Sequence, residues 1–216
     1  MVFMFLFNVE KAIELQKRLA KIVFDNFDSF PSLDYSKLRY IAGLDASYSR
    51  GLIHAVAVLI KYPSGELIDH VLVNQRINIP YIPGLLAFRE APGYFRALAK
   101  LKYEPDIIYV DGHGLSHPRG FGIATHIGFV LNKPSIGVAK SKLYGELVET
   151  NGRVLIKSHG RIVGEVLKHR GMELYVSIGY MIKLEDAVTL TKQLLRPEYD
   201  LPIPTALADK YTKKHK

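Results

Sequence analysis

The hydrophobic residues of this chain change their spacing from segment to segment, and each spacing predicts a type of element. In residues 8–24 they recur every three or four positions, which indicates a helix with Asn8 as its N-cap. Residues 39–79 contain three strand-like runs, separated by the turn-forming stretches SRG and YPSGE. We therefore expect a three-stranded antiparallel meander after the first helix.

The middle of the chain has the pattern of a strand–helix–strand crossover. Short apolar runs at 106–112 and 134–140 enclose a helical pattern at 119–133. A crossover of this kind joins parallel strands. A further helix is expected at 92–103, with Pro92 in its first turn, where the missing N–H removes no helical hydrogen bond.

The last third of the chain adds strands and two helices. Two strand-like runs at 160–169 and 172–179 predict a hairpin, and an amphipathic helix is expected at 183–195. A proline-containing loop and a short basic helix follow. Three antiparallel strands followed by parallel strands, with helices between them, predict a mixed α/β sheet flanked by helices on both faces. This is the element order of the ribonuclease H-like fold. Without a repeat or a linker, residues 1–216 are expected to form a single domain.

The composition is that of a folded, basic protein. Of its 216 residues, 48% are hydrophobic and 23% charged, and the net charge is +8 with a pI of about 9.5. Such a pI favours nucleic acid as a partner when the positive charge is clustered, although charge alone is a weak indication. The lack of cysteine excludes disulfides, thiolate zinc sites and a cysteine nucleophile. Scarce Asn, Gln and Cys are typical of hyperthermophile proteins.

The chain begins with MVFMFLFN, an apolar run that is too short to span a membrane. No basic residues precede it, as they would in a signal peptide. We expect a short strand or helical lead there, no membrane association and a cytoplasmic location.

Three carboxylates stand at positions where a sheet can gather them. Asp45 lies within an apolar strand, on the face of Gly43 and Ser47, and we expect this small polar face to border a cleft. Asp111 ends a buried strand, where open α/β sheets bind ligands, although an Asp that caps the next turn fits equally well. Glu90 alone fits a solvated helix residue better. If the three converge, their oxygens suit Mg²⁺ or Mn²⁺ and phosphoryl chemistry, which in a basic protein suggests a nuclease.

Four motifs carry a resemblance to a known family. GLDASYSRG, PYIPGLLAFREAP, DGHGLSHPRGFGIATHIG and GVAKSKLYG occur in this order within residues 42–145. Together they resemble the motifs of the endonuclease V family, which acts beside deaminated adenine. The resemblance implies a ribonuclease H-like fold and Mg²⁺-dependent hydrolysis, with Mn²⁺ expected to substitute. It also implies cleavage of the second phosphodiester bond 3′ to hypoxanthine, leaving 3′-hydroxyl and 5′-phosphate ends. A thermophilic archaeal source is expected.

The resemblance also implies roles for individual residues. Asp45, Glu90 and Asp111 match the metal-binding carboxylates, and Lys140 matches a lysine near the scissile phosphate. The segment implied to separate the strands consists of Pro80, Tyr81, Ile82 and Pro83. The positions implied to line the pocket for the displaced base are Gly84, Leu86, Gly112 and Ile123.

The physical chemistry of the PYIP segment agrees with a wedge. Proline restricts its own φ and the residue before it, so Tyr81 is held in an ordered loop that can insert at a base step. Gly84 lets the backbone approach an extruded base, whose 6-oxo and N1–H groups backbone N–H and C=O groups can read. By composition alone, Tyr81 fits a buried loop anchor better.

Some candidates depart from the family or stand outside its motifs. Asp209, in LAD, replaces the histidine of many bacterial members, and we expect a fourth carboxylate ligand there. His113 replaces a common glutamine, with an effect that stays open. We expect His117 to contact a phosphate or order a water, and His126 to be a satisfied core histidine. The lysines of residues 210–216 fit a phosphate grip and a solvated tail equally well.

Two other functions remain open from the sequence. One is a non-catalytic protein that binds lesions or structured nucleic acid, and the other is a ribonuclease H-like nuclease for branched DNA. The expected partner is DNA that contains deoxyinosine, single- or double-stranded, and inosine-containing RNA stays open as a substrate. The lesion range, including uracil, abasic sites and mismatches, and the number of metal ions also stay open. A monomer is expected.

Overall fold

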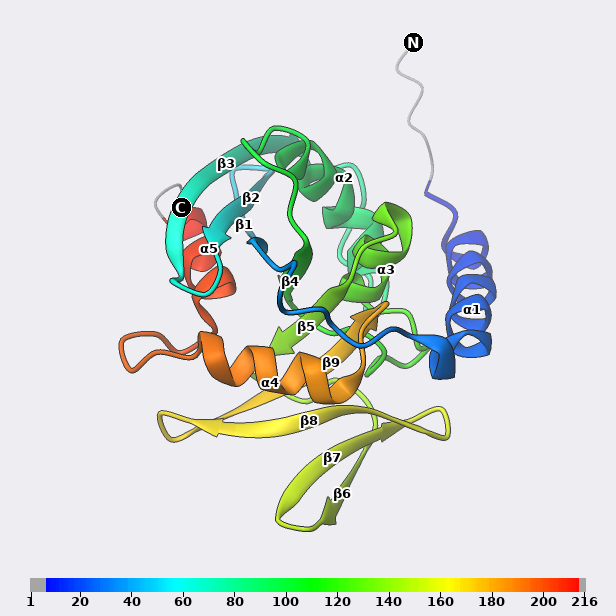
Figure 1. Cartoon of the computed structure of the whole chain (residues 1–216). Coiled ribbons are helices and arrows are strands. Elements are labelled where there is room, and N and C mark those ends of the chain that lie inside the picture. Colours follow the sequence, from blue (N-terminus) through cyan, green and yellow to red (C-terminus); the bar gives the residue numbers. More distant parts are fainter. Residues whose placement is uncertain (1–6, 214–216) are drawn as a thin grey trace.

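The structure, a computed structural model, describes residues 7–213 of the chain. In this part, nine strands form one mixed sheet in the order β3-β2-β1-β4-β5-β9-β8-β7-β6 (Figure 1). The strands are β1 Tyr40–Ser49, β2 Leu52–Lys61, β3 Glu66–Arg76, β4 Ile107–Asp111, β5 Ser135–Ala139, β6 Glu146–Thr150, β7 Arg153–Ser158, β8 Arg161–His169 and β9 Met172–Tyr180. The helices are α1 Val9–Asp25, the short 3₁₀ helix η1 Phe27–Ser29, α2 Leu86–Leu98, α3 Ile123–Leu131, α4 Leu184–Leu194 and α5 Ile203–Lys213.

The pairing of the strands confirms the predicted mixed sheet. β1, β2 and β3 pair antiparallel, while β1–β4 and β4–β5 pair in parallel. Leu44 of β1 lies opposite Val110 of β4. The next residues, Asp45 and Asp111, therefore occupy neighbouring positions of the two parallel strands and point to the same face of the sheet.

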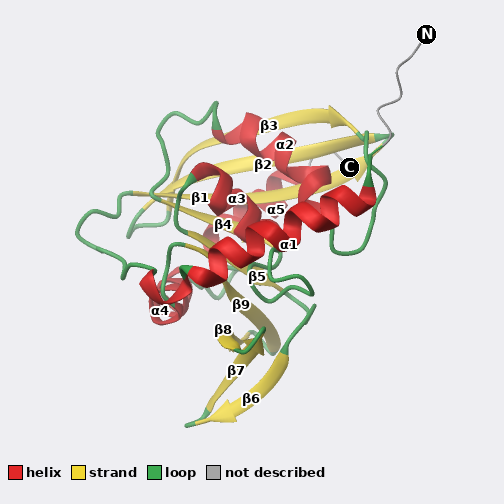
Figure 2. Ribbon diagram, turned by 90° about the vertical axis from the view of Figure 1, so that its right-hand side faces the viewer, coloured by secondary structure: helices red, strands yellow, loops and turns green. Residues whose placement is uncertain are grey.

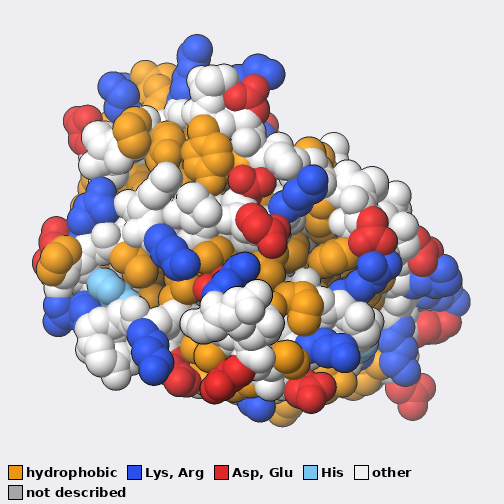
Figure 3. Space-filling model, turned by 60° about the horizontal axis from the view of Figure 1, so that its bottom comes forward, with side chains coloured by type: hydrophobic (Ala, Val, Ile, Leu, Met, Phe, Trp, Pro, Cys, Tyr) orange, Lys and Arg blue, Asp and Glu red, His pale blue; other side chains and the backbone are white. Residues whose placement is uncertain are grey.

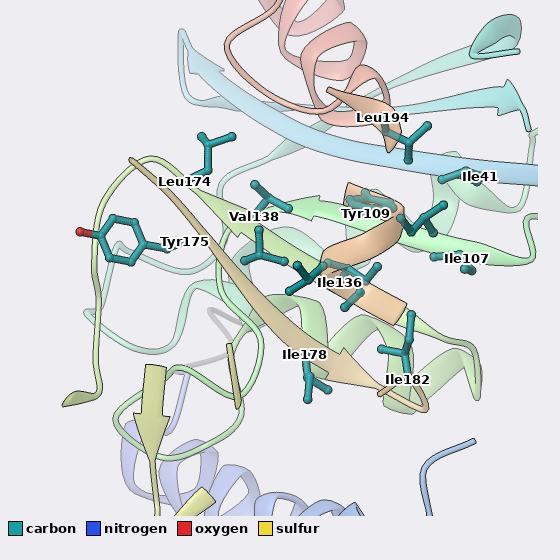
Figure 4. Close-up of a cluster of buried hydrophobic side chains, with 14 of the residues drawn as sticks. Ile41, Ile107, Tyr109, Ile136, Val138, Leu174, Tyr175, Ile178, Ile182 and Leu194 are labelled. Carbon is teal, nitrogen blue, oxygen red and sulfur yellow. The ribbon is translucent and has the colours of Figure 1, made fainter. Parts of the chain in front are cut away.

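Helices cover both faces of the sheet (Figures 1 and 2). On one face, α2 and α3 bury Ala42 and Leu44 of β1 in one hydrophobic cluster. On the other face, α4 and α5 cover a larger cluster, part of which is shown in Figure 4, that includes Ile41, Tyr109 and Ile136. Alternate residues of β1 thus enter two different cores, as expected for a strand buried on both faces.

Two helices begin at other residues than the pattern predicts. The helix expected at 92–103 begins at Leu86, so Pro92 lies inside α2. An interior proline costs about 3 kcal/mol, and the packing of the buried residues Ala91 and Tyr94 offsets it while Pro92 faces outward. The helix expected at 119–133 begins only at Ile123, because Gly120 adopts φ 64°, outside the helical region.

The hairpin of β6 and β7 was not predicted, since only the β8–β9 pair followed from the sequence. Most residues of β6 are exposed, so its sequence lacks the alternation that marks a half-buried strand. Figure 2 shows this hairpin extending away from the body of the sheet. Strand β7 pairs with β8, and β6 pairs with β7 as the outer strand of the sheet.

Some expectations concern the ends of the chain. Residues 1–6, the start of the apolar run, lie outside the described residues, as do Lys214 and Lys216. Within residues 7–213, no helix combines the length and the apolarity needed to cross a membrane. The single domain expected for residues 1–216 stays a prediction.

Candidate active site

Asp45 and Asp111 form the centre of the candidate site. Burial raises the pKa of Asp45, the charge of Asp209 adds to this, and a hydrogen bond from Thr212 opposes it. Burial, and next the charge of Asp45, raise the pKa of Asp111 to about 7, while Lys140 opposes the rise. Two half-buried carboxylates that destabilise each other's charge form a site where a cation would be stabilised.

The face of β1 that carries Asp45 does not border an open cleft over its whole length, as its small residues suggested. A Cβ added to Gly43 would lie 2.1 Å from the carbonyl oxygen of Pro204, so the glycine lets α5 approach the strand. Ser47 donates its hydroxyl to the carbonyl of Thr212 at 3.1 Å. The hydroxyl of Thr212 lies 2.9 Å from Oδ2 of Asp45. Helix α5 therefore covers this face and positions the Asp45 carboxylate.

Glu90 is buried in α2, with 5% of its surface exposed, and is not the solvated residue that its context suggested. Its Oε1 accepts a short hydrogen bond from the hydroxyl of Tyr48, and its Oε2 accepts one from Tyr94 at 3.0 Å. Burial raises the pKa of Glu90 to about 7, the two tyrosines oppose this, and the charge of Asp45 adds to it. Glu90 is thus electrostatically coupled to the aspartates while both of its oxygens are bound to tyrosines.

Asp209 approaches the aspartates from α5. Its charge raises the pKa of both Asp45 and Asp111. One of its oxygens accepts a hydrogen bond from Nζ of Lys213 at 2.6 Å. The assigned ligand set therefore converges on one region, although Asp209 is also paired with a lysine of its own helix.

The donor chemistry of this region fits a hard divalent cation. Within residues 7–213, no three carboxylate or imidazole groups are placed to share one ion, and Glu90 and Asp209 are hydrogen-bonded to other side chains. Mg²⁺ commonly uses only one or two carboxylates, and takes its remaining ligands from water and substrate phosphates. The pair Asp45 and Asp111 satisfies this requirement.

A pocket of about 360 Å³ adjoins Asp111. It gathers predicted residues from three of the four motifs. The predicted residues that line it are Tyr81, Gly84, Leu86, Asp111, Gly112, His117, Ile123 and Lys140.

The PYIP segment stands at the rim of this pocket. Tyr81 is 65% exposed, so the alternative of a buried loop anchor is wrong. Pro80 and Pro83 are exposed and Ile82 is half-buried, and none of the three lines the pocket. An exposed tyrosine between two prolines is geometrically able to insert into a base stack.

Gly84 is fixed by residues that the sequence did not suggest. Its φ of 77° places it in the left-handed region, which favours glycine. Its carbonyl accepts hydrogen bonds from Arg119 Nη2 at 2.6 Å and from Gln16 Nε2 at 2.9 Å. Gln16 also accepts a hydrogen bond from Nε of Arg119 at 2.5 Å. Helix α1, the loop after the PYIP segment and the loop before α3 are joined here.

Three histidines have lowered pKa values. Burial lowers the pKa of His113, His117 and His126 to about 4 each, so the three rings are neutral at pH 7. His117 lines the pocket and accepts a hydrogen bond at Nδ1 from the backbone N–H of Arg119, at 3.1 Å. His126 is half-buried against the rings of Phe88 and Phe121, and its buried Nδ1 has no hydrogen-bond partner among residues 7–213, so the expectation of a satisfied core residue is wrong.

Some functional candidates were missed at the sequence level. Tyr48 and Tyr94 bind Glu90, Thr212 binds Asp45, and Lys142 lines the pocket beside Lys140. Lys142 and Tyr48 had a signal, since they stand in the same motifs as Lys140 and Asp45. Tyr48 and Thr212 lie 42 and 167 positions from their partners, and Tyr94, four residues after Glu90, was missed because the helix was expected to begin only at Pro92.

Solved structures similar to this chain are endonucleases. Human endonuclease V has a TM-score of 0.83 at 26% identity, covering 96% of this chain and 98% of that one. Ciona intestinalis endonuclease V, solved with a 23mer DNA containing an inosine followed by a ribo-adenosine, has a TM-score of 0.79 at 24% identity, covering 97% and 98%. The fold is confirmed as ribonuclease H-like, and the class of protein is a nuclease that hydrolyses phosphodiester bonds.

Sequence comparison narrows this class to one family. The family model of endonuclease V matches residues 26–210. Endonuclease V of Desulfurococcus amylolyticus is 54% identical over 208 residues, which cover 96% of this chain and 95% of that protein. The chain belongs to the endonuclease V family, whose members are metal-dependent nucleases. The archaeal relative agrees with the archaeal source expected from the sequence.

Proposed function

We propose that this protein is a Mg²⁺-dependent endonuclease that recognises hypoxanthine and acts in the repair of deaminated bases. It hydrolyses the second phosphodiester bond 3′ to the lesion and leaves 3′-hydroxyl and 5′-phosphate ends. DNA that contains deoxyinosine is the proposed substrate. RNA that contains inosine is the alternative substrate, and the experiment below compares the two. The observation that carries this proposal is the pocket that joins an exposed tyrosine, backbone of two glycines and Asp111 in one cavity.

The pocket supports recognition of a base that has left the stack. Gly84 and Gly112 bring their backbone close to the cavity, where the N–H of Gly84 and the C=O of Gly112 can pair with the polar edge of hypoxanthine, while the Gly84 carbonyl and the Gly112 N–H are already hydrogen-bonded within the protein. Leu86 and Ile123 contribute apolar side chains against which a flat ring can pack. A pocket of this mixed kind orients a ligand by a few polar groups on an apolar lining.

Tyr81 supports the opening step. Its exposed ring takes the place of the displaced base and separates the strands, at a cost of roughly a few kcal/mol for unstacking. The hydrogen bonds of Gln16 and Arg119 to Gly84 hold the loop, so less ordering is needed on binding. Damaged or mismatched bases unstack more readily, which contributes selectivity.

The carboxylates and Lys140 support hydrolysis. Asp45 and Asp111 would hold the cation, with Glu90 and Asp209 completing the ligand set after release from their present partners. When bound, Mg²⁺ stabilises charge on the attacking and leaving oxygens of the phosphate. Lys140 lines the same pocket as Asp111 and binds a phosphate oxygen. His117, neutral at pH 7, orients the phosphate or a water through Nε2, because its Nδ1 accepts from the N–H of Arg119.

The DNA complex of the Ciona intestinalis enzyme supports inosine as the lesion for a protein of this fold. The test uses matched oligonucleotides with one deoxyinosine in DNA or one inosine in RNA, with Mg²⁺ or with EDTA. We expect Mg²⁺-dependent incision one nucleotide beyond the lesion on its 3′ side, and the ratio of the two rates identifies the preferred nucleic acid. Binding of both without incision would instead support a non-catalytic protein, and equal cleavage of undamaged junctions would support a branched-DNA nuclease.

A further inference from the structure

A second hollow lies beside the pocket of the active site. Its volume is about 500 Å³, and its lining combines Tyr144, His159 and Lys157 with Lys142 and Leu143. Lys142 and Leu143 also line the first pocket, so the two hollows lie next to each other. The second hollow is formed by the loop after β5 and by the strands and turns of the β6–β8 region. Figure 3 shows the end of the molecule that carries these strands, with basic and hydrophobic side chains exposed next to each other.

The aromatic part of this hollow is held rigidly. Ser116 donates a hydrogen bond to the carbonyl of Tyr144 at 2.6 Å, which ties the loop to the loop after β4. The ring of Tyr144 stacks on His159, with centroids 5.5 Å apart and planes 28° apart. His159 in turn contacts the ring of Phe24 at 5.5 Å. Tyr144 is the outermost ring of this stack and is 40% exposed, so part of its ring surface is available to a ligand.

The charge of this hollow is suited to a polyanion. Lys142 and Lys157 are exposed, and neither is within 4.0 Å of a carboxylate in the described part of the chain. Glu146 is the one acidic residue of its lining and stands opposite Lys157 on the neighbouring strand. Two exposed lysines and an exposed ring in one hollow have the combination that binds single-stranded nucleic acid, in which bases stack and phosphates pair with cations.

We propose that this second hollow, which we call the flanking-strand groove, binds single-stranded nucleotides that flank the lesion. A base stacks on Tyr144, and Lys142 and Lys157 bind the phosphates on either side of it. This inference rests on the proposed function, since it extends the path of the strand that enters the active site. Because Lys142 lines both the groove and the pocket, a strand whose phosphate lies at Lys140 can extend from the pocket into the groove.

The test compares Tyr144→Ala with wild type on single-stranded DNA that has one central deoxyinosine and ten nucleotides on each side. Loss of one stacked base is expected to raise the substrate concentration for half-maximal single-turnover cleavage roughly 5- to 150-fold. The rate at saturation is expected to stay unchanged, because Tyr144 touches no catalytic group. Tyr144→Phe keeps the ring and is expected to behave as wild type. Tyr103→Ala, which removes another exposed tyrosine on the connection between α2 and β4, is the matched control.

Shortened substrates locate the effect. Only one of the two flanks is expected to reach the groove. Removal of that flank is expected to abolish the difference between wild type and Tyr144→Ala, and removal of the opposite flank is expected to preserve it. Lys157→Ala is expected to reduce the slope of log affinity against log salt by about 0.7, the value for one phosphate contact to a single strand. The proposed groove would be refuted if Tyr144→Ala bound the substrate with unchanged affinity. It would also be refuted if the variant were weakened equally on all shortened substrates.

Binding to a lesion-free single strand separates this inference from the proposed function. Fluorescence anisotropy in EDTA measures that binding without cleavage, and Tyr144→Ala is expected to weaken it as well. If wild type fails to cut deoxyinosine DNA while Tyr144→Ala still weakens strand binding, the proposed function fails and the groove stands. If wild type cuts and Tyr144→Ala binds the strand normally, the groove fails and the proposed function stands.

Discussion

Gln16 joins helix α1 to the loop that carries the wedge, and its removal is the sharpest test of how that loop is held. The side chain is 1% exposed. Its Nε2 donates to the carbonyls of Gly84 at 2.9 Å and Phe121 at 2.8 Å, and its Oε1 accepts from Arg119 at 2.5 Å. Gln16→Ala removes all three hydrogen bonds and leaves two carbonyls with one partner fewer.

The size of the effect follows from these bonds. A neutral hydrogen bond contributes about 0.5–1.5 kcal/mol net, and one to a charged group about 1.5–3 kcal/mol. Two of the first kind and one of the second sum to about 2.5–6 kcal/mol of unfolding free energy. For the substrate, loosening the Gly84 carbonyl by one hydrogen bond of about 1.4 kcal/mol corresponds to about tenfold weaker binding of deoxyinosine DNA.

Two measurements check the expectation. Guanidinium unfolding gives the change in stability, and single-turnover cleavage over a range of substrate concentrations separates binding from the chemical step. We expect the half-saturation concentration to rise about tenfold while the rate at saturation changes little, because Gln16 contacts no carboxylate of the site. Gln16→Glu is the matched variant, since it can keep the bond to Arg119 but cannot donate to either carbonyl.

The reasoning is refuted if Gln16→Ala binds and cleaves deoxyinosine DNA as wild type does while its stability falls. In that case the contact would stabilise α1 without ordering the wedge loop. Equal losses in Gln16→Glu and Gln16→Ala would assign the effect to the two carbonyl contacts, and a milder Gln16→Glu would assign part of it to Arg119.

Three further predictions address other steps. Asp45→Asn or Asp111→Asn is expected to abolish cleavage and spare lesion binding, and a gel assay that detects normal cleavage by either variant would contradict the metal assignment. Tyr81→Ala is expected to weaken binding to deoxyinosine DNA while leaving residual cleavage Mg²⁺-dependent, and unchanged affinity would contradict the wedge. The pKa of His126 is lowered to about 4 from 6.5, so the unfolded chain binds its proton first as the pH falls. The free energy of unfolding is therefore unaffected by this group above pH 6.5 and falls by roughly 2 kcal/mol by pH 5. Guanidinium unfolding at the two pH values should show a smaller loss in His126→Phe.

Local elements were predictable where one segment contains its own determinants. Asn8 caps α1 as predicted, with its side chain accepting from the N–H of Lys11 at 2.8 Å. The turns after β1 and β2 were predictable because glycine stands where the backbone requires positive φ, as at Gly51 and Gly65. The start of α2 was not, because packing against the sheet overrides the preference of Pro92 for a first turn.

The candidate site divides in the same way. Its motifs were recognisable because each lies within a short segment, and the pocket indeed brings together Tyr81, Gly84, Asp111 and Lys140. The tyrosines around Glu90 were not predictable, since Tyr48 comes from β1, 42 residues away, and Tyr94 lies one turn further along α2, whose start was expected beyond Glu90. Nor was the role of the small face of β1, because only the approach of α5 shows why Gly43 has no side chain.

By itself, the sequence determined the order and type of most elements, the mixed sheet and the motifs that identify the family, since these depend on periodicity and on contiguous residues. Only the tertiary structure decided the state of the side chains: Glu90 bound by two tyrosines, Asp45 covered by α5, and Gly84 held by Gln16 and Arg119. It also decided that the β6–β7 hairpin places a hollow next to the active site. Burial and hydrogen bonding between residues tens to over a hundred positions apart depend on how the elements pack, which no local pattern of a single sequence contains.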